Sequence, residues 1–361
     1  MVRRLAAGIA ALGLGAVFAV ANTAGSAQAA VPDHWGFAYV NIPLGIPDPL
    51  HQAGSWPAPF KVHVTPGAPG QEFVRFPQIA SKAGVVHVTA VAGIPVWCQA
   101  QRWFPAGADE IAAVRCYRPG GAPVFVPFAV TFSQSSPGAL PPGRAYGYVH
   151  FDPLQGIVTR FNSSGGVNTV TPGGVGSWLV SLPGLGSAGR AGNVQVTAAD
   201  PANPAKCKLA AWASLPGRQV LQVRCFDKLA APLKTGWTLT YQRGRAVTGT
   251  QPKLFAYTFD GQPFVPGPYA PLPPAVNFNS QSAVNTIRTA GLGLRLAVLP
   301  RVGAVPNTVL VTAFGAGAGF CNLLTIWATS PAQVVVRDVA CYTPTGARQN
   351  LASLITYTSA H

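Results

Sequence analysis

Charged residues are scarce in this sequence, and acidic ones are scarcest. Only 10% of the 361 residues are charged and only ten are Asp or Glu, whereas 48% are apolar. This balance excludes a solvated, disordered chain, which needs many charges and few apolar residues. Forty glycines and 35 prolines are instead typical of many short strands joined by turns.

Enzyme motifs are missing as well. The sequence has no G-x-S-x-G nucleophile elbow and no phosphate-binding loop. Gly291-Leu-Gly293 enters a strand-like run and is interpreted as a turn. Paired carboxylates would indicate a glycosidase, but Asp109-Glu110 falls in an expected loop. Asp152 and Asp260 each follow an aromatic strand, where Asp favours turns.

Long apolar runs are confined to the N-terminus. Arg3-Arg4 is followed by an apolar run over 5–21 and by an A-x-A cleavage site at 27–29, which together predict a secretory signal peptide over residues 1–30. An uncleaved membrane anchor is the alternative, although the run is at the short limit for a span. No other run of that length follows, so we expect a secreted, extracellular protein.

Six cysteines occur, two in each of three similar phrases. The phrases are Cys98…Trp103…Cys116, Cys207…Trp212…Cys225 and Cys321…Trp327…Cys341. Two cysteines per copy predict one local disulfide per copy: Cys98–Cys116, Cys207–Cys225 and Cys321–Cys341. No C-x2-C or C-x4-C spacing is present and no histidine lies near these cysteines, so zinc is not expected. Paired cysteines also favour an oxidising compartment.

The phrases define an internal repeat of about 110 residues, which is the size of a domain rather than of a solenoid unit. We predict domains over 31–137, 138–250 and 251–361. Each has an aromatic first strand, a V-x-V-T-A-like strand, a cysteine hairpin and a closing strand. Seven or eight short strands without a convincing helix predict an all-β fold with three tandem β-sandwich-like domains. The tryptophan after each first cysteine is expected to pack on the core.

Histidines are concentrated in the first repeat, at positions 34, 51, 63 and 87, but no metal-ligand spacing links them. We therefore expect neither a metal nor a cofactor. Exposed aromatic residues could stack on sugars, and strand alternation buries about half of them. The candidate aromatic ligand contacts are Trp35, Tyr39, Trp56, Tyr146, Tyr148 and Tyr257.

The second repeat shows a resemblance in its phrases over 161–170, 192–198 and 207–226. They look like a repeat of secreted, uncharacterised actinobacterial proteins. The third repeat departs from the pattern, because its hairpin is two residues longer. The resemblance implies an exported repeat protein and carries no activity.

Basic residues suggest the class of partner. Without the two arginines of the predicted signal peptide the net charge is about +13, which attracts polyanions. Arginine use typical of a high-GC organism is the alternative explanation. We expect a non-enzymatic protein that binds an anionic polymer or glycan of the cell envelope through tandem domains. The alternatives are a structural or protective envelope protein, and a hydrolase with a site in the first repeat that involves His51 or His87.

Overall fold

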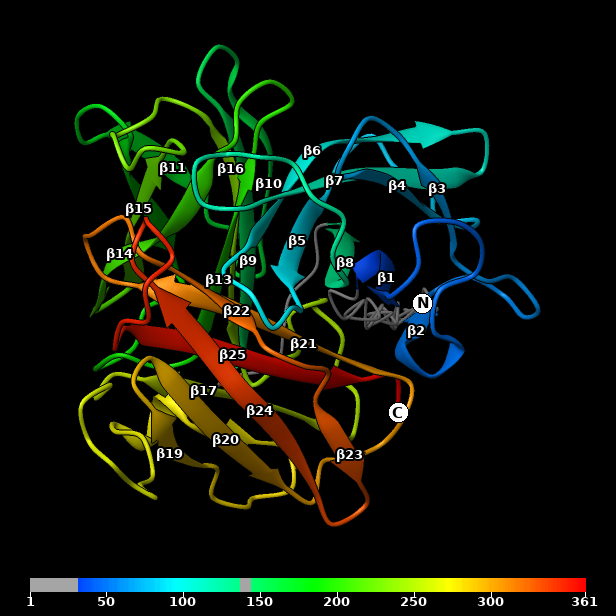
Figure 1. Cartoon of the computed structure of the whole chain (residues 1–361). Coiled ribbons are helices and arrows are strands. Elements are labelled where there is room, and N and C mark those ends of the chain that lie inside the picture. The colour runs from blue at the N-terminus through cyan, green and yellow to red at the C-terminus, as the bar shows by residue number, and fades with distance from the viewer. Residues whose placement is uncertain (1–31, 137–143) are drawn as a thin grey trace, which may run out of the picture.

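The computed structural model describes residues 32–136 and 144–361 (Figure 1). The expectation of an all-β fold is confirmed. Helical structure in the described residues is limited to two 3-10 turns, η1 (Pro49–His51) and η2 (Pro274–Val276). The expected signal peptide and the first boundary between repeats, at 137/138, lie outside the described residues. The second boundary, at 250/251, falls between two strands.

Each repeat contributes two groups of four main strands, and the strand order is the same in all three repeats. The terminal group contains the first and last strands of a repeat. The terminal groups are β2 (Gln52–Gly54), β1 (Pro32–Val40), β8 (Phe128–Ser135) and β5 (Val85–Ala90); β10 (Gly156–Asn162), β9 (Ala145–Asp152), β16 (Gly236–Arg243) and β13 (Asn193–Ala199); and β18 (Phe278–Asn279), β17 (Phe255–Asp260), β25 (Ala352–Ser359) and β21 (Asn307–Phe314).

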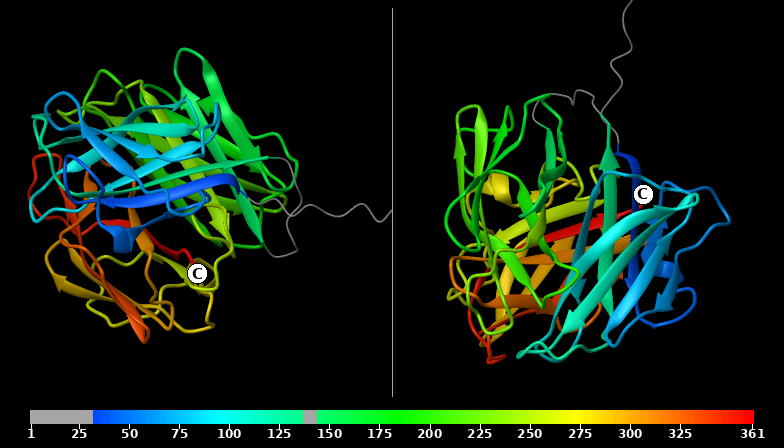
Figure 2. Two further views of the ribbon diagram at one scale, coloured as in Figure 1. Left: turned by 90° about the vertical axis from the view of Figure 1, so that its right-hand side faces the viewer. Right: turned by 90° about the horizontal axis from the view of Figure 1, so that it is seen from above.

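The second group of each repeat, the disulfide group, carries both cysteines. The disulfide groups are β3 (His63–Pro66), β4 (Gln71–Phe76), β7 (Asp109–Tyr117) and β6 (Trp97–Ala106); β11 (Thr169–Pro172), β12 (Ser177–Pro183), β15 (Arg218–Phe226) and β14 (Lys206–Leu215); and β19 (Thr286–Gly291), β20 (Leu294–Pro300), β24 (Gln333–Tyr342) and β22 (Phe320–Leu323), with β23 (Ala328–Ser330) also paired to β24. Figure 1 shows the three repeats in blue to cyan, green, and yellow to red, and Figure 2 shows the same arrangement from two further directions.

The two groups of a repeat enclose its apolar core, as in a sandwich. In the first repeat, Val86 and Phe132 of the terminal group share one buried cluster with Val74 and Val114 of the disulfide group. Equivalent clusters fill the second and third repeats. These strands are rich in β-branched and aromatic residues, which fit a pleated, buried surface.

The cysteine hairpins place the two cysteines of each repeat directly opposite one another. Cys98 pairs in register with Cys116, Cys207 with Cys225, and Cys321 with Cys341. The Cα–Cα distances are 4.0, 4.1 and 4.0 Å, and each pair forms a disulfide. The prediction of one local disulfide per repeat is therefore confirmed. Trp212 and Trp327 are buried in their cores, and Trp103 is partly buried against its own.

The three repeats form a closed ring, in which each repeat pairs with both of the others, and not a linear row of separate domains. Strand β6 of the first repeat pairs in parallel with β13 of the second, and β14 of the second pairs with β21 of the third. The third repeat returns to the first through a parallel bridge between Leu323 and Val91. One backbone hydrogen bond marks each junction, at 3.0, 2.9 and 2.7 Å: Asp200 to Ala100, Gly315 to Leu209, and Ala92 to Leu323.

The strands β5, β13 and β21 meet at the centre of the ring, where one threonine of each binds the next repeat. The backbone amide of Val88 donates to Thr197 Oγ1 at 3.2 Å. The amide of Val196 donates to Thr312 Oγ1 at 3.0 Å, and that of Val311 donates to Thr89 Oγ1 at 2.9 Å. This cyclic set of bonds gives the molecule a pseudo-threefold axis.

The central position explains why β5 does not alternate between buried and exposed residues, as a strand with one covered face does. All six residues of β5 are buried. Val86 and Val88 face the core of their own repeat, whereas His87 and Thr89 bond to the other repeats. Both faces of the strand are therefore covered.

Candidate functional site

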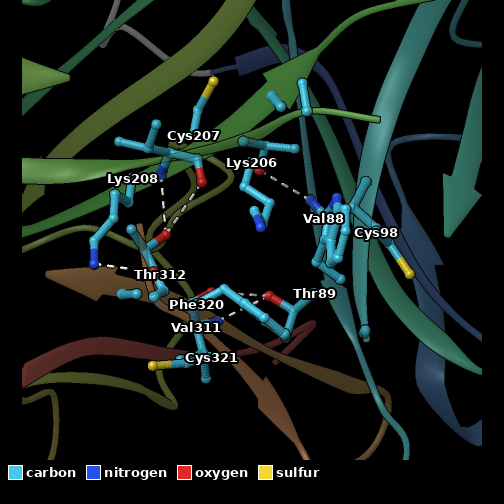
Figure 3. Close-up of a pocket in the computed structure, with 18 residues that line it drawn as sticks. Val88, Thr89, Cys98, Lys206, Cys207, Lys208, Val311, Thr312, Phe320 and Cys321 are labelled. Atoms are coloured by element: carbon cyan, nitrogen blue, oxygen red, sulfur yellow. Dashed lines mark hydrogen bonds between the residues drawn. The ribbon is translucent and has the colours of Figure 1, made fainter. Parts of the chain in front are cut away.

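A small cavity lies on the pseudo-threefold axis, and all three repeats line it (Figure 3). Its volume is about 50 Å³. Its wall comes from the centres of β5, β13 and β21 and from the first residues of β6, β14 and β22. The residue before the first cysteine is Trp97 in the first repeat, Lys206 in the second and Phe320 in the third. Two repeats thus place an aromatic ring at this position and one places an amine.

Lys206 points its amine into the space that the other lining residues surround (Figure 3). The residue is only 6% exposed. Nζ lies 4.5 Å from the centroid of the Trp97 ring and 5.4 Å from that of Phe320. It has no hydrogen-bond partner among the described residues. Burial lowers the pKa of Lys206 to about 8, and the charge of Asp227 partly opposes this shift.

Lys208 is the second buried amine in the wall of the axial cavity. Its Nζ donates to the carbonyl oxygen of Gly319 in the third repeat at 3.0 Å (Figure 3). Burial, and then the positive charges of Arg224 and Lys206, lower the pKa of Lys208 to about 7. The wall of the cavity contains these two lysines and no acidic residue.

An arginine lies over an aromatic ring at one equivalent position in every repeat. The ring belongs to the residue after the second cysteine, which is Tyr117, Phe226 or Tyr342. The guanidinium carbons lie 5.6, 5.3 and 4.4 Å from the ring centroids in the pairs Arg115–Tyr117, Arg224–Phe226 and Arg348–Tyr342. The rings are buried and the arginines are partly exposed, so the cations cover the rings.

The turns that follow these aromatic residues meet at one end of the molecule. Each turn is closed by a backbone hydrogen bond: Arg118 to Ala122, Asp227 to Ala231, and Thr343 to Ala347. Together they line a hollow of about 350 Å³, formed by Pro119, Gly120, Lys228, Leu229, Pro344 and Thr345. We call the three turns and the three arginines at their bases the turn face.

The turn face is strongly basic. It contains Arg115, Arg118, Arg224, Lys228 and Arg348, and its only acid is Asp227. The Asp227 carboxylate accepts the backbone amides of Leu229 and Ala231 within its own turn, both at 2.8 Å. The sequence alone does not mark this surface as a site. The aromatic residue after each second cysteine was the available signal, but only the fold brings Arg348 onto Tyr342.

Most of the aromatic residues suggested for sugar stacking lie in the interior. Tyr39, Tyr146, Tyr148 and Tyr257 are at most 9% exposed. The Tyr146 hydroxyl donates to the carbonyl of Val247 at 3.0 Å, and the amide of Gly244 donates to the hydroxyl of Tyr257 at 3.1 Å. These rings hold the fold together and leave no open face for a ligand. Trp35 and Trp56 are partly exposed, and both belong to the first repeat.

The two histidines considered for a hydrolase lie in different surroundings. His87 is buried on the axis, where its Nδ1 lies 3.2 Å from Thr197 Oγ1 and its Nε2 lies 2.8 Å from Thr240 Oγ1. Burial lowers the pKa of His87 to about 3. His51 Nδ1 lies 2.9 Å from Asp48 Oδ2, and its ring packs on Trp327 of the third repeat. The structure does not bring His51 and His87 together as parts of one site.

Glu110 is placed differently from the loop position expected for it, and Asp260, which accepts the amide of Gln262 at 3.3 Å as expected for a turn, has a further role. Glu110 is buried in β7, where it accepts the backbone amide of Ser81 at 2.9 Å, and burial raises its pKa to about 7. Asp260 forms a buried ion pair with Arg295 at 2.7 Å and accepts a bond from the Tyr269 hydroxyl. Asp152 does serve a turn, because it accepts the amides of Leu154 and Gln155.

The described residues contain no group of three or more His, Cys, Asp or Glu that could hold a metal ion. No helix in the same part of the chain is long and apolar enough to cross a membrane. Three disulfides indicate an oxidising compartment, as found outside the cell.

Comparisons of the chain with protein-family models, with curated proteins and with solved structures gave no match. The resemblance to secreted actinobacterial repeat proteins therefore stays a prediction. Two features of the structure suggest a function. One is the cluster of basic residues on the turn face, and the other is the axial cavity with its two buried lysines.

Proposed function

We propose that this chain is a secreted, non-enzymatic protein that binds an anionic polymer of the cell envelope or an extracellular anionic glycan through the turn face. The observation that carries the proposal is the set of three arginines on three equivalent aromatic rings, at the bases of the three turns that line one hollow. Guanidinium groups suit this role because they offer several fixed donors to carboxylates and phosphates.

The arrangement supports multivalent binding of a repeating ligand. Three similar cationic positions on one rigid body can bind successive charges of one polymer, and each further contact is then intramolecular. The ring closure supports this role, because parallel strand pairs and threonine bonds hold the three turns in one fixed relation. Binding sites on rigid elements lose less conformational entropy when a ligand binds.

A salt titration tests the proposal directly. The protein is passed over immobilised polygalacturonate, over immobilised polyglycerol phosphate and over neutral dextran, in sodium gluconate buffers of rising concentration. We expect saturable binding to at least one polyanion that weakens about tenfold or more for a fourfold rise in salt, because released counterions oppose binding. Equal retention on dextran, or no retention on either polyanion, would contradict it.

A structural or protective envelope protein is the second candidate. The closed ring and the three disulfides support this candidate. A chain with one disulfide in every repeat, and with its third repeat paired to its first, resists local unfolding. This alternative predicts high protease resistance without saturable binding to any polymer in the same titration.

A further inference from the structure

The Lys206 amine is buried in the axial cavity, and binding of a polymer at the turn face gives it no role. It is buried on the axis, away from solvent, and has no hydrogen-bond partner among the described residues. An uncompensated buried charge of this kind destabilises the folded state unless another group pairs with it. The faces of Trp97 and Phe320 supply part of that compensation, because a ring face attracts a cation.

A second unpaired donor belongs to the same wall. The indole nitrogen of Trp97 is also buried and has no hydrogen-bond partner among the described residues. Among the buried side-chain nitrogen and oxygen atoms of the residues that line the cavity, these two are the ones without any hydrogen-bond partner, and both are donors. Lys208 adds a second amine, and the wall has no carboxylate to pair with either lysine. The unmet requirement is therefore for an acceptor that carries negative charge.

The size of the cavity limits what that acceptor can be. Its volume of about 50 Å³ is several times the roughly 10–15 Å³ that one water needs on this measure. A single atomic anion with part of its water shell fits this space, whereas a sugar or a nucleotide does not. The buried wall also favours an anion of single charge, since Lys208 already donates to Gly319 and Lys206 is the one amine without a partner.

We propose that the axial cavity is a binding site for one halide-sized monovalent anion, held by the Lys206 amine beside Trp97 and Phe320 at the junction of the three repeats. This site is separate from the polymer-binding turn face, because it lies inside the molecule. It depends on Lys206, which occupies the position held by an aromatic residue in the other two repeats. The anion accepts a hydrogen bond from the Lys206 amine of the second repeat and lies beside Trp97 of the first repeat and Phe320 of the third, so it links the three repeats. The lowered pKa of Lys206 agrees with an amine whose positive charge lacks a counterion.

Crystals of the wild-type protein grown or soaked in sodium bromide test the site without any substitution. We expect an anomalous bromide peak in contact with Lys206 Nζ, inside the ring of cavity residues. Density for water alone at this position in bromide crystals would overturn the proposal. The result does not depend on whether any variant folds.

Thermal unfolding in two salts gives a second, independent readout. At equal ionic strength and pH 7, wild type should melt about 2 °C or more higher in sodium chloride than in sodium gluconate, whose anion is too large for the cavity. Lys206→Met should lose this difference, and Lys61→Met, at an exposed lysine in the first repeat, should keep it. If both variants respond to chloride as wild type does, chloride acts elsewhere and the proposal fails.

Discussion

Thr89 of the first repeat accepts a hydrogen bond from the backbone amide of Val311 in the third, at 2.9 Å, across 222 residues of chain. Two equivalent bonds, from Val88 to Thr197 and from Val196 to Thr312, complete the circle. The hydroxyl hydrogens of two of these threonines also have acceptors. Thr312 donates to Gln195 at 2.9 Å, and Thr89 donates to the carbonyl of Val311 at 3.3 Å.

Removing one of these hydroxyls should weaken the whole molecule. Thr89→Val leaves the buried amide of Val311 without its partner, so we expect the free energy of unfolding to fall by about 1–3 kcal/mol. Urea unfolding followed by tryptophan fluorescence measures the change. Thr65→Val, at an exposed position of the edge strand β3 in the same repeat, is the control. Equal stability of the two variants would show that the axial bond contributes little.

His87 should make the axial junction sensitive to acid. Its pKa falls from 6.5 to about 3 on folding, so the unfolded chain binds a proton that the folded chain does not. The stabilisation is complete above pH 6.5 and is lost as the pH falls from 6.5 toward 3, by up to about 1.4 kcal/mol per pH unit. Glu72 and Glu110 oppose this loss, because their raised pKa values, each about 7, add stability as the pH falls from 7.

A glutamine variant separates the histidine from these carboxyl groups. Gln195 already occupies the equivalent position in β13, so His87→Gln keeps a polar side chain of a type that the fold accommodates. We expect the unfolding free energy of wild type to fall more steeply than that of His87→Gln between pH 6 and 4. His63→Gln, which changes an exposed histidine, should follow wild type. Parallel curves for wild type and His87→Gln would refute the assignment.

The buried ion pair between Asp260 and Arg295 should be far more sensitive than the exposed one. Arg295→Met leaves the Asp260 carboxylate buried and unpaired, which should cost about 3–5 kcal/mol in unfolding free energy. Arg75→Met breaks the exposed pair with Asp109 and should cost less than about 1 kcal/mol. Denaturant titration of the two variants gives the comparison. Similar small losses would mean that the remaining contacts of Asp260 are enough to compensate its charge.

The cysteine phrases made the hairpins predictable, because a local repeat with two cysteines fixes which strands are neighbours. Cys207 and Cys225, for example, lie directly opposite each other on the two strands of one hairpin. The ring was not predictable in the same way. Its junctions depend on single parallel contacts such as Ala199 with Ala100, and no local pattern marks a pairing between strands so far apart in the chain.

Burial was also harder to predict than strand position. Alternation predicts one buried face for a strand, but β5 and β13 are covered on both faces because they lie on the axis. Tyr146, Tyr148 and Glu110 are buried as well, through contacts away from the axis: the two tyrosines pack with Val85 and Phe161, and Glu110 accepts the amide of Ser81. The candidate site was missed because its arginines come from different positions: Arg115 and Arg224 precede a cysteine, whereas Arg348 follows one.

Binding by two triple variants of equal net charge tests the central claim most directly. One variant replaces Arg115, Arg224 and Arg348 by Gln on the turn face, and the other replaces the exposed residues Arg218, Arg288 and Arg337 by Gln elsewhere. Affinity for polygalacturonate and polyglycerol phosphate is measured for both in sodium gluconate. We predict that the turn-face variant loses about tenfold or more in affinity, while the control loses far less. Equal losses in the two variants would show that net charge, and not the turn face, governs binding.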